Sequence, residues 1–79
     1  MITADFAILP VGTEDTECKE YVTAAVQAIK DSGLNYQLTG MGTQIEAENL
    51  KELYEAIANA QEAVFKTGIG RVYTVIKVD

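Results

Sequence analysis

The order in which two hydrophobic periodicities follow one another limits the fold of this chain most. Apolar and polar residues alternate, as in half-buried strands, in four segments: residues 2–9, 34–39, 43–48 and 71–78. Apolar residues recur at the spacing of one helix face in two others: residues 16–32 and 50–66. The chain is therefore predicted to run strand, helix, strand, strand, helix, strand.

Glycine and asparagine mark where the predicted helices end and begin. Gly33 suits the left-handed residue that closes the first helix. Asn49, followed three residues later by Glu52, has the pattern of a capped start for the second. The 79 residues leave no room for a linker, so one domain over residues 1–79 is expected. Two similar βαβ crossovers predict an α+β, ferredoxin-like βαββαβ sandwich, a four-stranded antiparallel sheet of order 4-1-3-2 with two helices on one face.

The second face of the predicted sheet has no helix to cover it. It should carry Ala7, Leu9, Tyr73 and Val75, which together are too apolar to remain exposed to solvent. A chain this short buries only about 60% of its unfolded surface and usually gains stability from a disulfide, a metal or a partner. Cys18 is the only cysteine, so a disulfide within the chain is excluded. We expect a homodimer through this open face, with a tetramer as an alternative.

Composition argues against several classes of function. The net charge of −6 does not favour nucleic acid, whose phosphates require a basic face. No apolar run approaches the roughly 20 residues that cross a membrane. The start lacks a basic signal-like segment, and one free cysteine fits a cytoplasmic location. The chain has no histidine, so a zinc site is improbable and no cofactor or metal is expected.

Catalytic constellations are equally hard to build. The usual general base is missing, and Cys18 lies on the apolar stripe of the first helix, where a packed thiol is the simpler interpretation. The turn at residues 10–13 could present amides to an anion, but it lacks the Walker pattern and reads more simply as the end of a strand. We therefore expect a protein that is not an enzyme.

Glu46 is the strongest candidate for a functional residue. It lies in the third predicted strand, in a kind of position where glutamate is depleted. An exposed carboxylate and a ligand-binding one both fit the pattern, and burial by a partner would require it to be paired. Thr43 and Gln44 could supply neutral hydrogen bonds nearby. Tyr36 fits either the core or the wall of a ligand site.

Four segments, in this order and spacing, resemble the small ferredoxin-like thiamine-binding proteins. They are Ile8-Leu9-Pro10-Val11-Gly12-Thr13, Ser32-Gly33-Leu34-Asn35-Tyr36, Met41-Gly42-Thr43-Gln44-Ile45-Glu46 and Gly70-Arg71-Val72-Tyr73-Thr74-Val75-Ile76-Lys77-Val78-Asp79. The likeness covers nearly the whole chain. Two features depart from the family: Ala47 stands where glycine is common, and the sequence stops at Asp79, where members tend to continue with a short basic tail.

The resemblance implies an oligomer that binds thiamine or its hydroxymethylpyrimidine moiety without catalysis, in vitamin handling or salvage. It implies that Glu46 pairs with the pyrimidine, that Thr43 is a hydrogen-bonding neighbour and that Tyr36 is a stacking or hydroxyl contact. It further implies that Pro10 and Gly12 shape the mouth of the site.

Two other classes share this fold. One is an ACT-like regulatory sensor that binds an amino acid at a subunit interface. The other is a small dimeric ferredoxin-like enzyme, which usually requires a histidine or another strong base. The fold does not decide among these classes, because each function depends on its site.

Overall fold

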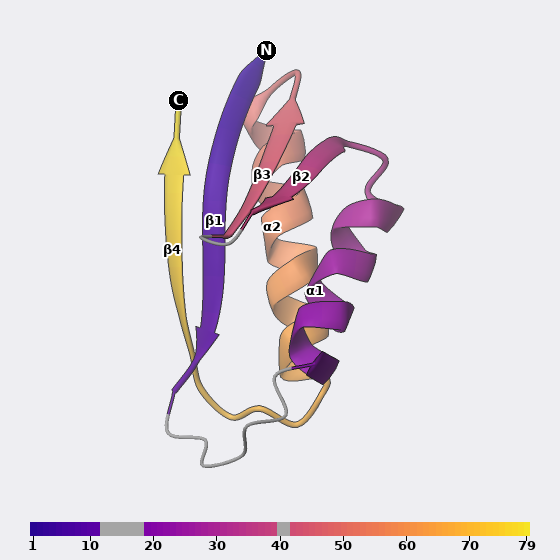
Figure 1. Cartoon of the computed structure of the whole chain (residues 1–79). Helices are drawn as coiled ribbons and strands as arrows, with labels where there is room; N and C mark the ends of the chain where they lie inside the picture. The colour runs from indigo at the N-terminus through magenta and orange to yellow at the C-terminus, as the bar shows by residue number, and fades with distance from the viewer. Residues whose placement is uncertain (12–18, 40–41) are drawn as a thin grey trace.

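The computed structural model describes residues 1–11, 19–39 and 42–79. Its elements follow in the order β1 (Ile2–Pro10), α1 (Lys19–Asp31), β2 (Asn35–Thr39), β3 (Gly42–Ala47), α2 (Leu50–Phe65) and β4 (Val72–Val78). The four strands form one antiparallel sheet in the order β2-β3-β1-β4, and both helices lie on the same side of it (Figure 1). This arrangement confirms the predicted ferredoxin-like topology and its strand order.

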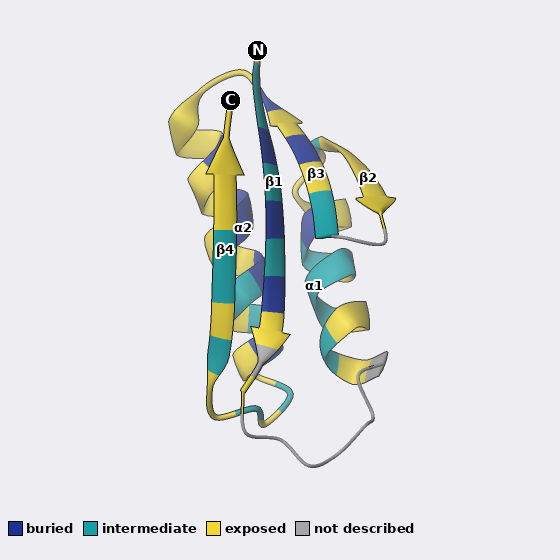
Figure 2. Ribbon diagram, turned by 60° about the vertical axis from the view of Figure 1, so that its left-hand side comes forward, coloured by how far each residue is buried: buried dark blue, intermediate teal, exposed yellow. Residues whose placement is uncertain are grey.

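The alternation along β1 divides the sheet into two faces. β1 pairs with β3 on one side and with β4 on the other, so its register determines which residues of both neighbouring strands face the helices. Ala4, Phe6 and Ile8 are buried toward the helices, whereas Asp5 and Ala7, which alternate with them, are only partly covered (Figure 2). The predicted split of this strand into two faces is thereby confirmed.

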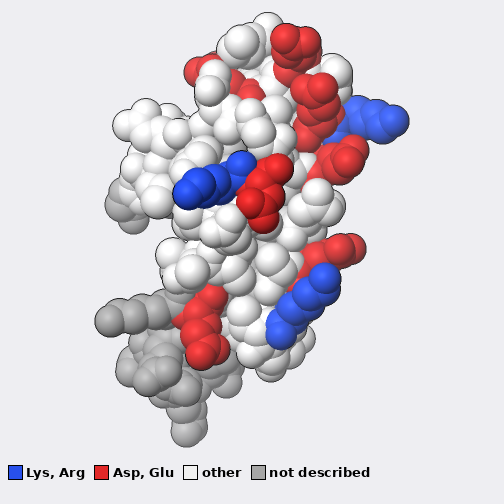
Figure 3. Space-filling model, turned by 90° about the vertical axis from the view of Figure 1, so that its right-hand side faces the viewer, with Lys and Arg blue, Asp and Glu red and all other residues white. Residues whose placement is uncertain are grey.

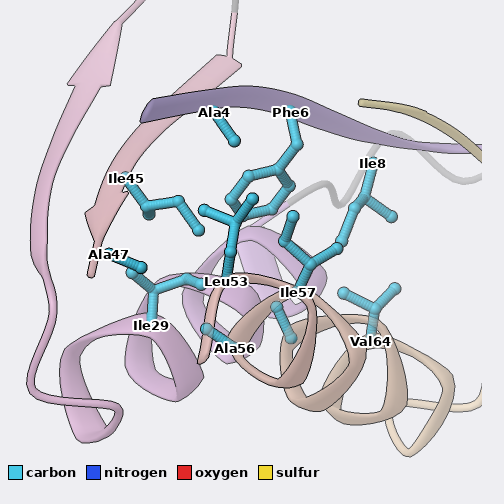
Figure 4. Close-up of a cluster of buried hydrophobic side chains, with 11 residues drawn as sticks. Ala4, Phe6, Ile8, Ile29, Ile45, Ala47, Leu53, Ala56, Ile57 and Val64 are labelled. Atoms are coloured by element: carbon cyan, nitrogen blue, oxygen red, sulfur yellow. The ribbon is translucent and has the colours of Figure 1, made fainter. Parts of the chain in front are cut away.

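The core lies between β1, β3 and α2. Side chains from β1 and β3 point toward those of α2, with Phe6 and Leu53 close to its centre (Figure 4). Leu53 and Val64 are fully covered, and burying an aliphatic side chain of this size contributes roughly 1.5–3 kcal/mol. The predicted cap of α2 is also confirmed, because the Glu52 backbone N–H donates to Oδ1 of Asn49 at 2.9 Å.

Helix α1 contributes less to this core than its apolar stripe predicted. Ile29 is buried, but Val22, at the other end of the same apolar stripe, is 46% exposed. The physical reason is that α1 packs chiefly along α2 rather than on the sheet. Tyr21, Ala25 and Ala28 are the partly buried residues of α1 that pack against the core. Cys18 and the predicted start of this helix lie outside the described residues.

The predicted ends of the described elements agree with the structure to within one residue, apart from that start. The first strand continues through Pro10 instead of ending before it. Pro10 lies opposite Val72 of β4. The pairing with β4 continues past it, because the Val11 N–H donates to the Arg71 carbonyl at 3.1 Å. The N–H that proline lacks would point toward β3, whose pairing with β1 has already ended at Phe6. Proline is therefore tolerated here.

Replacing Gly42 by alanine should destabilise the fold. A Cβ at this position would lie 2.6 Å from the carbonyl oxygen of Phe6, a backbone atom of the central strand, and the φ of 154° disfavours a side chain. We expect Gly42→Ala to lower the free energy of unfolding by about 1–3 kcal/mol in urea titration. Gly70→Ala is the matched control: its Cβ would meet nothing within 4 Å, so its unfolding free energy should hardly change. Equal losses in both variants would contradict this account.

Candidate functional site

Thr43 and Glu46, the central pair of the predicted site, lie on opposite faces of the sheet. Thr43 is opposite Phe6 and Leu38, on the side of the helices. Glu46 is opposite Thr3 and Asn35, on the open side. Successive side chains of a strand point to opposite faces, so residues three positions apart cannot share one. No single small ligand can contact both side chains within one chain.

On the helix side, Thr43 lines an open groove between α1 and the sheet. The cavity has a volume of about 310 Å³. Most of its lining is apolar and comes from β1, α1 and β2, with three polar side chains among it: Phe6, Ile8, Val22, Ala25, Val26, Leu38, Tyr21, Thr39 and Thr43. The volume is at the lower end of the range of small-molecule sites, which are mostly apolar with a few placed polar groups.

The β2–β3 end of this groove is held by a local hydrogen-bonding arrangement. The Thr39 hydroxyl donates to the Gly42 carbonyl at 3.0 Å and accepts from the Gly42 N–H at 3.1 Å. These bonds place Thr43 directly after a constrained turn position. Tyr21 lies across the groove on α1, and the sequence analysis did not single it out. The available signal was that Tyr21, Ala25 and Ala28 recur at helical spacing beside the predicted stripe.

Glu46 lies in a second hollow, on the open face of the sheet. This hollow, of about 330 Å³, is lined mainly by polar residues: Thr3, Asn35, Tyr36, Gln37, Gln44 and Glu46. The side chain of Glu46 is exposed in the single chain, which matches the simpler of the two interpretations left open by the sequence. Thr43 and Gln44 were the two predicted hydrogen-bonding neighbours of Glu46. Of these, only Gln44 lies on the same face of the sheet as Glu46.

The remaining predicted site residues divide between these two places. Tyr36 is 39% exposed and borders the Glu46 hollow, although its register opposite Ile45 puts it on the helix-facing side of the edge strand. Pro10 ends β1 two residues beyond Ile8, which lines the groove. Gly12 lies outside the described residues. The register therefore puts the side chains of Tyr36 and Thr43 on the helix-facing side of the sheet and that of Glu46 on the open side.

The open face itself has an apolar half and a polar half. Ala7 and Leu9 lie opposite Val75 and Tyr73, as predicted, and form the apolar half. The polar half contains Glu46 and its neighbours on β3 and β2. Leu9 and Tyr73 are 50% and 61% exposed, which is unusual for large apolar side chains lying directly opposite one another.

The described residues contain no cluster of carboxylate and thiol groups that could hold a metal ion. On the face that carries α1, acidic side chains predominate and basic ones stand singly among them (Figure 3). Within the same part of the chain, neither helix has the length and hydropathy that crossing a bilayer requires. The chemistry available is therefore that of hydroxyls, carboxylates and apolar walls.

Comparison with known proteins identifies relatives across the whole chain. A UPF0045 protein of Methanothermobacter thermautotrophicus is 49% identical over 79 residues, which are all of this chain and 80% of the relative. A Bacillus cereus domain of unknown function has the same fold, with a TM-score of 0.88 and 27% identity over 99% of this chain and 73% of that one. A Thermotoga maritima protein assigned provisionally to thiamine biosynthesis or salvage has a TM-score of 0.83 at 19% identity, over 99% of this chain and 81% of that one.

The profile of one protein family, described as thiamine-binding protein, matches residues 4–79. That match includes nearly all of β1, both helices, the β2–β3 hairpin and β4. It agrees with the likeness seen in the four sequence segments and with the ferredoxin-like topology of the sheet. The chain therefore belongs to the thiamine-binding protein family.

Proposed function

We propose that this protein binds thiamine or its hydroxymethylpyrimidine moiety, as an oligomer and without catalysis, in the handling or salvage of the vitamin. Family membership is the observation that carries this proposal. The net charge of −6 suits a ligand with a cationic thiazolium ring. The absence of histidine from the chain leaves the described residues without the commonest general base, which favours binding over reaction.

The groove beside α1 is a better candidate for the ligand-binding site than the hollow on the open face. It is concave and mostly apolar, as a flat heteroaromatic ring requires, and Thr43 and Tyr21 offer hydroxyls on its two walls. The Tyr21 ring also provides an aromatic face for a cation. Pro10 and Gly12, which follow Ile8 in the sequence, are proposed to shape its mouth.

Glu46 keeps a proposed role only if the ligand lies on the open face instead, where Tyr36 would only border the site. There a carboxylate could pair with the ring nitrogen and the amino group of the pyrimidine through charge-assisted hydrogen bonds. The hollow is polar and open to solvent in the single chain, so a second copy packed on this face would be needed to enclose it. We place the ligand in the groove and treat the open-face position as the alternative that the next experiment distinguishes.

Titration calorimetry with two variants tests the ligand and its position together. With the ligand in the groove, Thr43→Val should weaken binding of thiamine and of hydroxymethylpyrimidine by about 1 kcal/mol or more, since it removes a hydroxyl without changing the volume much. Glu46→Gln should leave the affinity unchanged. The reverse pattern, with a loss of roughly 1–3 kcal/mol for Glu46→Gln, would move the ligand to the open face.

An unrelated organic cation of similar size and a set of amino acids are the controls for that titration. Neither should produce saturable heat with the wild-type protein. Recovery of unchanged thiamine after prolonged incubation, measured by chromatography, should confirm binding without conversion. If the amino acids bind and thiamine does not, the vitamin-binding proposal is wrong.

The proposed association through the open face predicts a second result. Leu9→Asp would place an unpaired charge in the apolar half of that face, so we expect the dissociation constant of the oligomer to rise by at least tenfold in sedimentation equilibrium. Leu50→Asp is the matched control, because Leu50 is 52% exposed at the first turn of α2, away from the open face. Similar masses for both variants and the wild type would contradict the open-face interface.

A further inference from the structure

Strand β1 has one stretch in which only one of its two edges is paired. Its ladder to β3 ends at the pair Phe6–Thr43, whereas its ladder to β4 continues to Pro10. In Figure 1, β1 correspondingly runs on beyond β2 and β3. Between Phe6 and Pro10, therefore, no described strand lies along the edge of β1 that faces away from β4.

The hydrogen bonds at the two ends of the β1–β4 ladder fix the direction in which each backbone group points. Thr3 and Asp79 exchange two bonds of 3.0 and 2.7 Å, and Val11 donates to Arg71 at 3.1 Å. Neighbouring residues of a strand point their N–H and C=O groups to opposite edges. The odd-numbered residues of β1 therefore face β4, and the even-numbered ones face β3 or, beyond its end, the open edge. In β4 the even-numbered groups correspondingly point away from β1.

Ile8 is the residue that offers both a donor and an acceptor on this open edge. It is the even-numbered position between Phe6, which pairs with Thr43, and Pro10, which has no N–H. No described residue pairs with the backbone N–H or C=O of Ile8. Unpaired backbone groups beside apolar side chains cost free energy until water or a ligand bonds to them. The edge thus presents one donor–acceptor pair that a ligand can use.

This pair points into the groove beside α1. The groove is lined by four consecutive residues of β1, 6–9, although their side chains alternate between the two faces of the sheet. It therefore runs along the edge of the strand. Val22 and Ala25 of α1 and Leu38 of β2 line its other walls. The backbone of Ile8 is a polar feature of a mostly apolar groove, where a hydrogen bond is stronger than in water.

We propose that the backbone of Ile8 recognises the aminopyrimidine ring, its N–H donating to a ring nitrogen and its C=O accepting from the adjacent amino group. This inference rests on the proposed binding of thiamine or its pyrimidine moiety in the groove. An amino group beside a ring nitrogen is matched by one donor and one acceptor side by side, which is how amide side chains recognise adenine. The N–H and C=O of one extended residue have that arrangement, because both point to the same edge.

The length of the open edge favours a small ring over a peptide strand. Pro10 limits this edge to one complete donor–acceptor pair, whereas the free edge of β4 runs along seven residues. The groove volume of about 310 Å³ is likewise that of a small-molecule site. The ligand class that fits is a planar heterocycle with an amino group next to a ring nitrogen.

Backbone recognition replaces the role that the resemblance gave to Glu46. The Glu46 side chain lies on the open face, away from Thr43. Thr43 lies opposite Phe6, two residues from Ile8 along β1, and Thr43 and Ile8 line the same groove. One ring can therefore contact the Ile8 backbone and the Thr43 hydroxyl together, and no carboxylate is required.

Amide hydrogen exchange, measured by NMR on the wild-type protein, tests the donor directly. In the free protein the Ile8 N–H should exchange about tenfold or more faster than those of Ala7 and Leu9, which point to β4. Saturating thiamine should slow the exchange of Ile8 about tenfold or more and bring it close to that of these two neighbours. Protection of Ile8 without ligand would mean that its edge is already paired, and fast exchange in the complex would mean that the ligand does not use it. Either result overturns the proposal.

Two thiamine analogues test the ligand class by titration calorimetry. Pyrithiamine keeps the aminopyrimidine and has a pyridinium in place of the thiazolium, so its dissociation constant should lie within about threefold of that of thiamine. Oxythiamine has an oxygen in place of the amino group and a proton on the adjacent ring nitrogen. In the same orientation it would set donor against donor and acceptor against acceptor at Ile8, so its dissociation constant should be about tenfold higher or more.

The two measurements separate this inference from the proposed function. If thiamine does not bind at all, the proposed function fails and the role of Ile8 fails with it. If thiamine binds but leaves the exchange of Ile8 unchanged, or binds no more tightly than oxythiamine, the role of Ile8 alone is overturned.

Discussion

The pairing of β1 with neighbours on both sides is the constraint on which the rest of the structure depends. Strand β1 lies between β3 and β4, so the alternation of its side chains decides which residues of the three strands face the helices. Ala4 and Phe6 bring Ile45 with them into the core, beneath α2. The same alternation places Ala7 and Leu9 on the face that no helix covers. A single register thus generates both the core and the surface available for association.

The groove beside α1 follows from how the two helices share one face of that sheet. α2 packs onto β1 and β3, and α1 packs mainly along α2. The N-terminal half of α1 therefore covers the sheet incompletely, leaving Val22 exposed and a cavity between α1 and the strands. In a chain this small, a helix that packs only partly onto the sheet provides a concave apolar surface without a second domain.

The fold was largely predictable from the sequence, whereas the spatial grouping of the candidate site residues was not. Strand and helix periodicities, the N-cap at Asn49 and the glycine at Gly33 were enough to place the elements and the sheet order. Grouping Thr43 with Glu46 treated nearness in the chain as nearness in space, and regular strand geometry separates the two by the thickness of the sheet. Tyr21 was missed because helical spacing alone does not say which flank of an amphipathic helix turns toward the sheet.

The sequence by itself determined the element order, the faces of the strands and the apolar character of the open face, because these depend on local periodicity. Only the tertiary structure decided that β4 is an edge with its even-numbered backbone groups free, that α1 stands partly away from the sheet, and that Glu46 is exposed. These features depend on contacts between segments far apart in the chain, and local patterns carry no information about which distant surfaces compete to pack together.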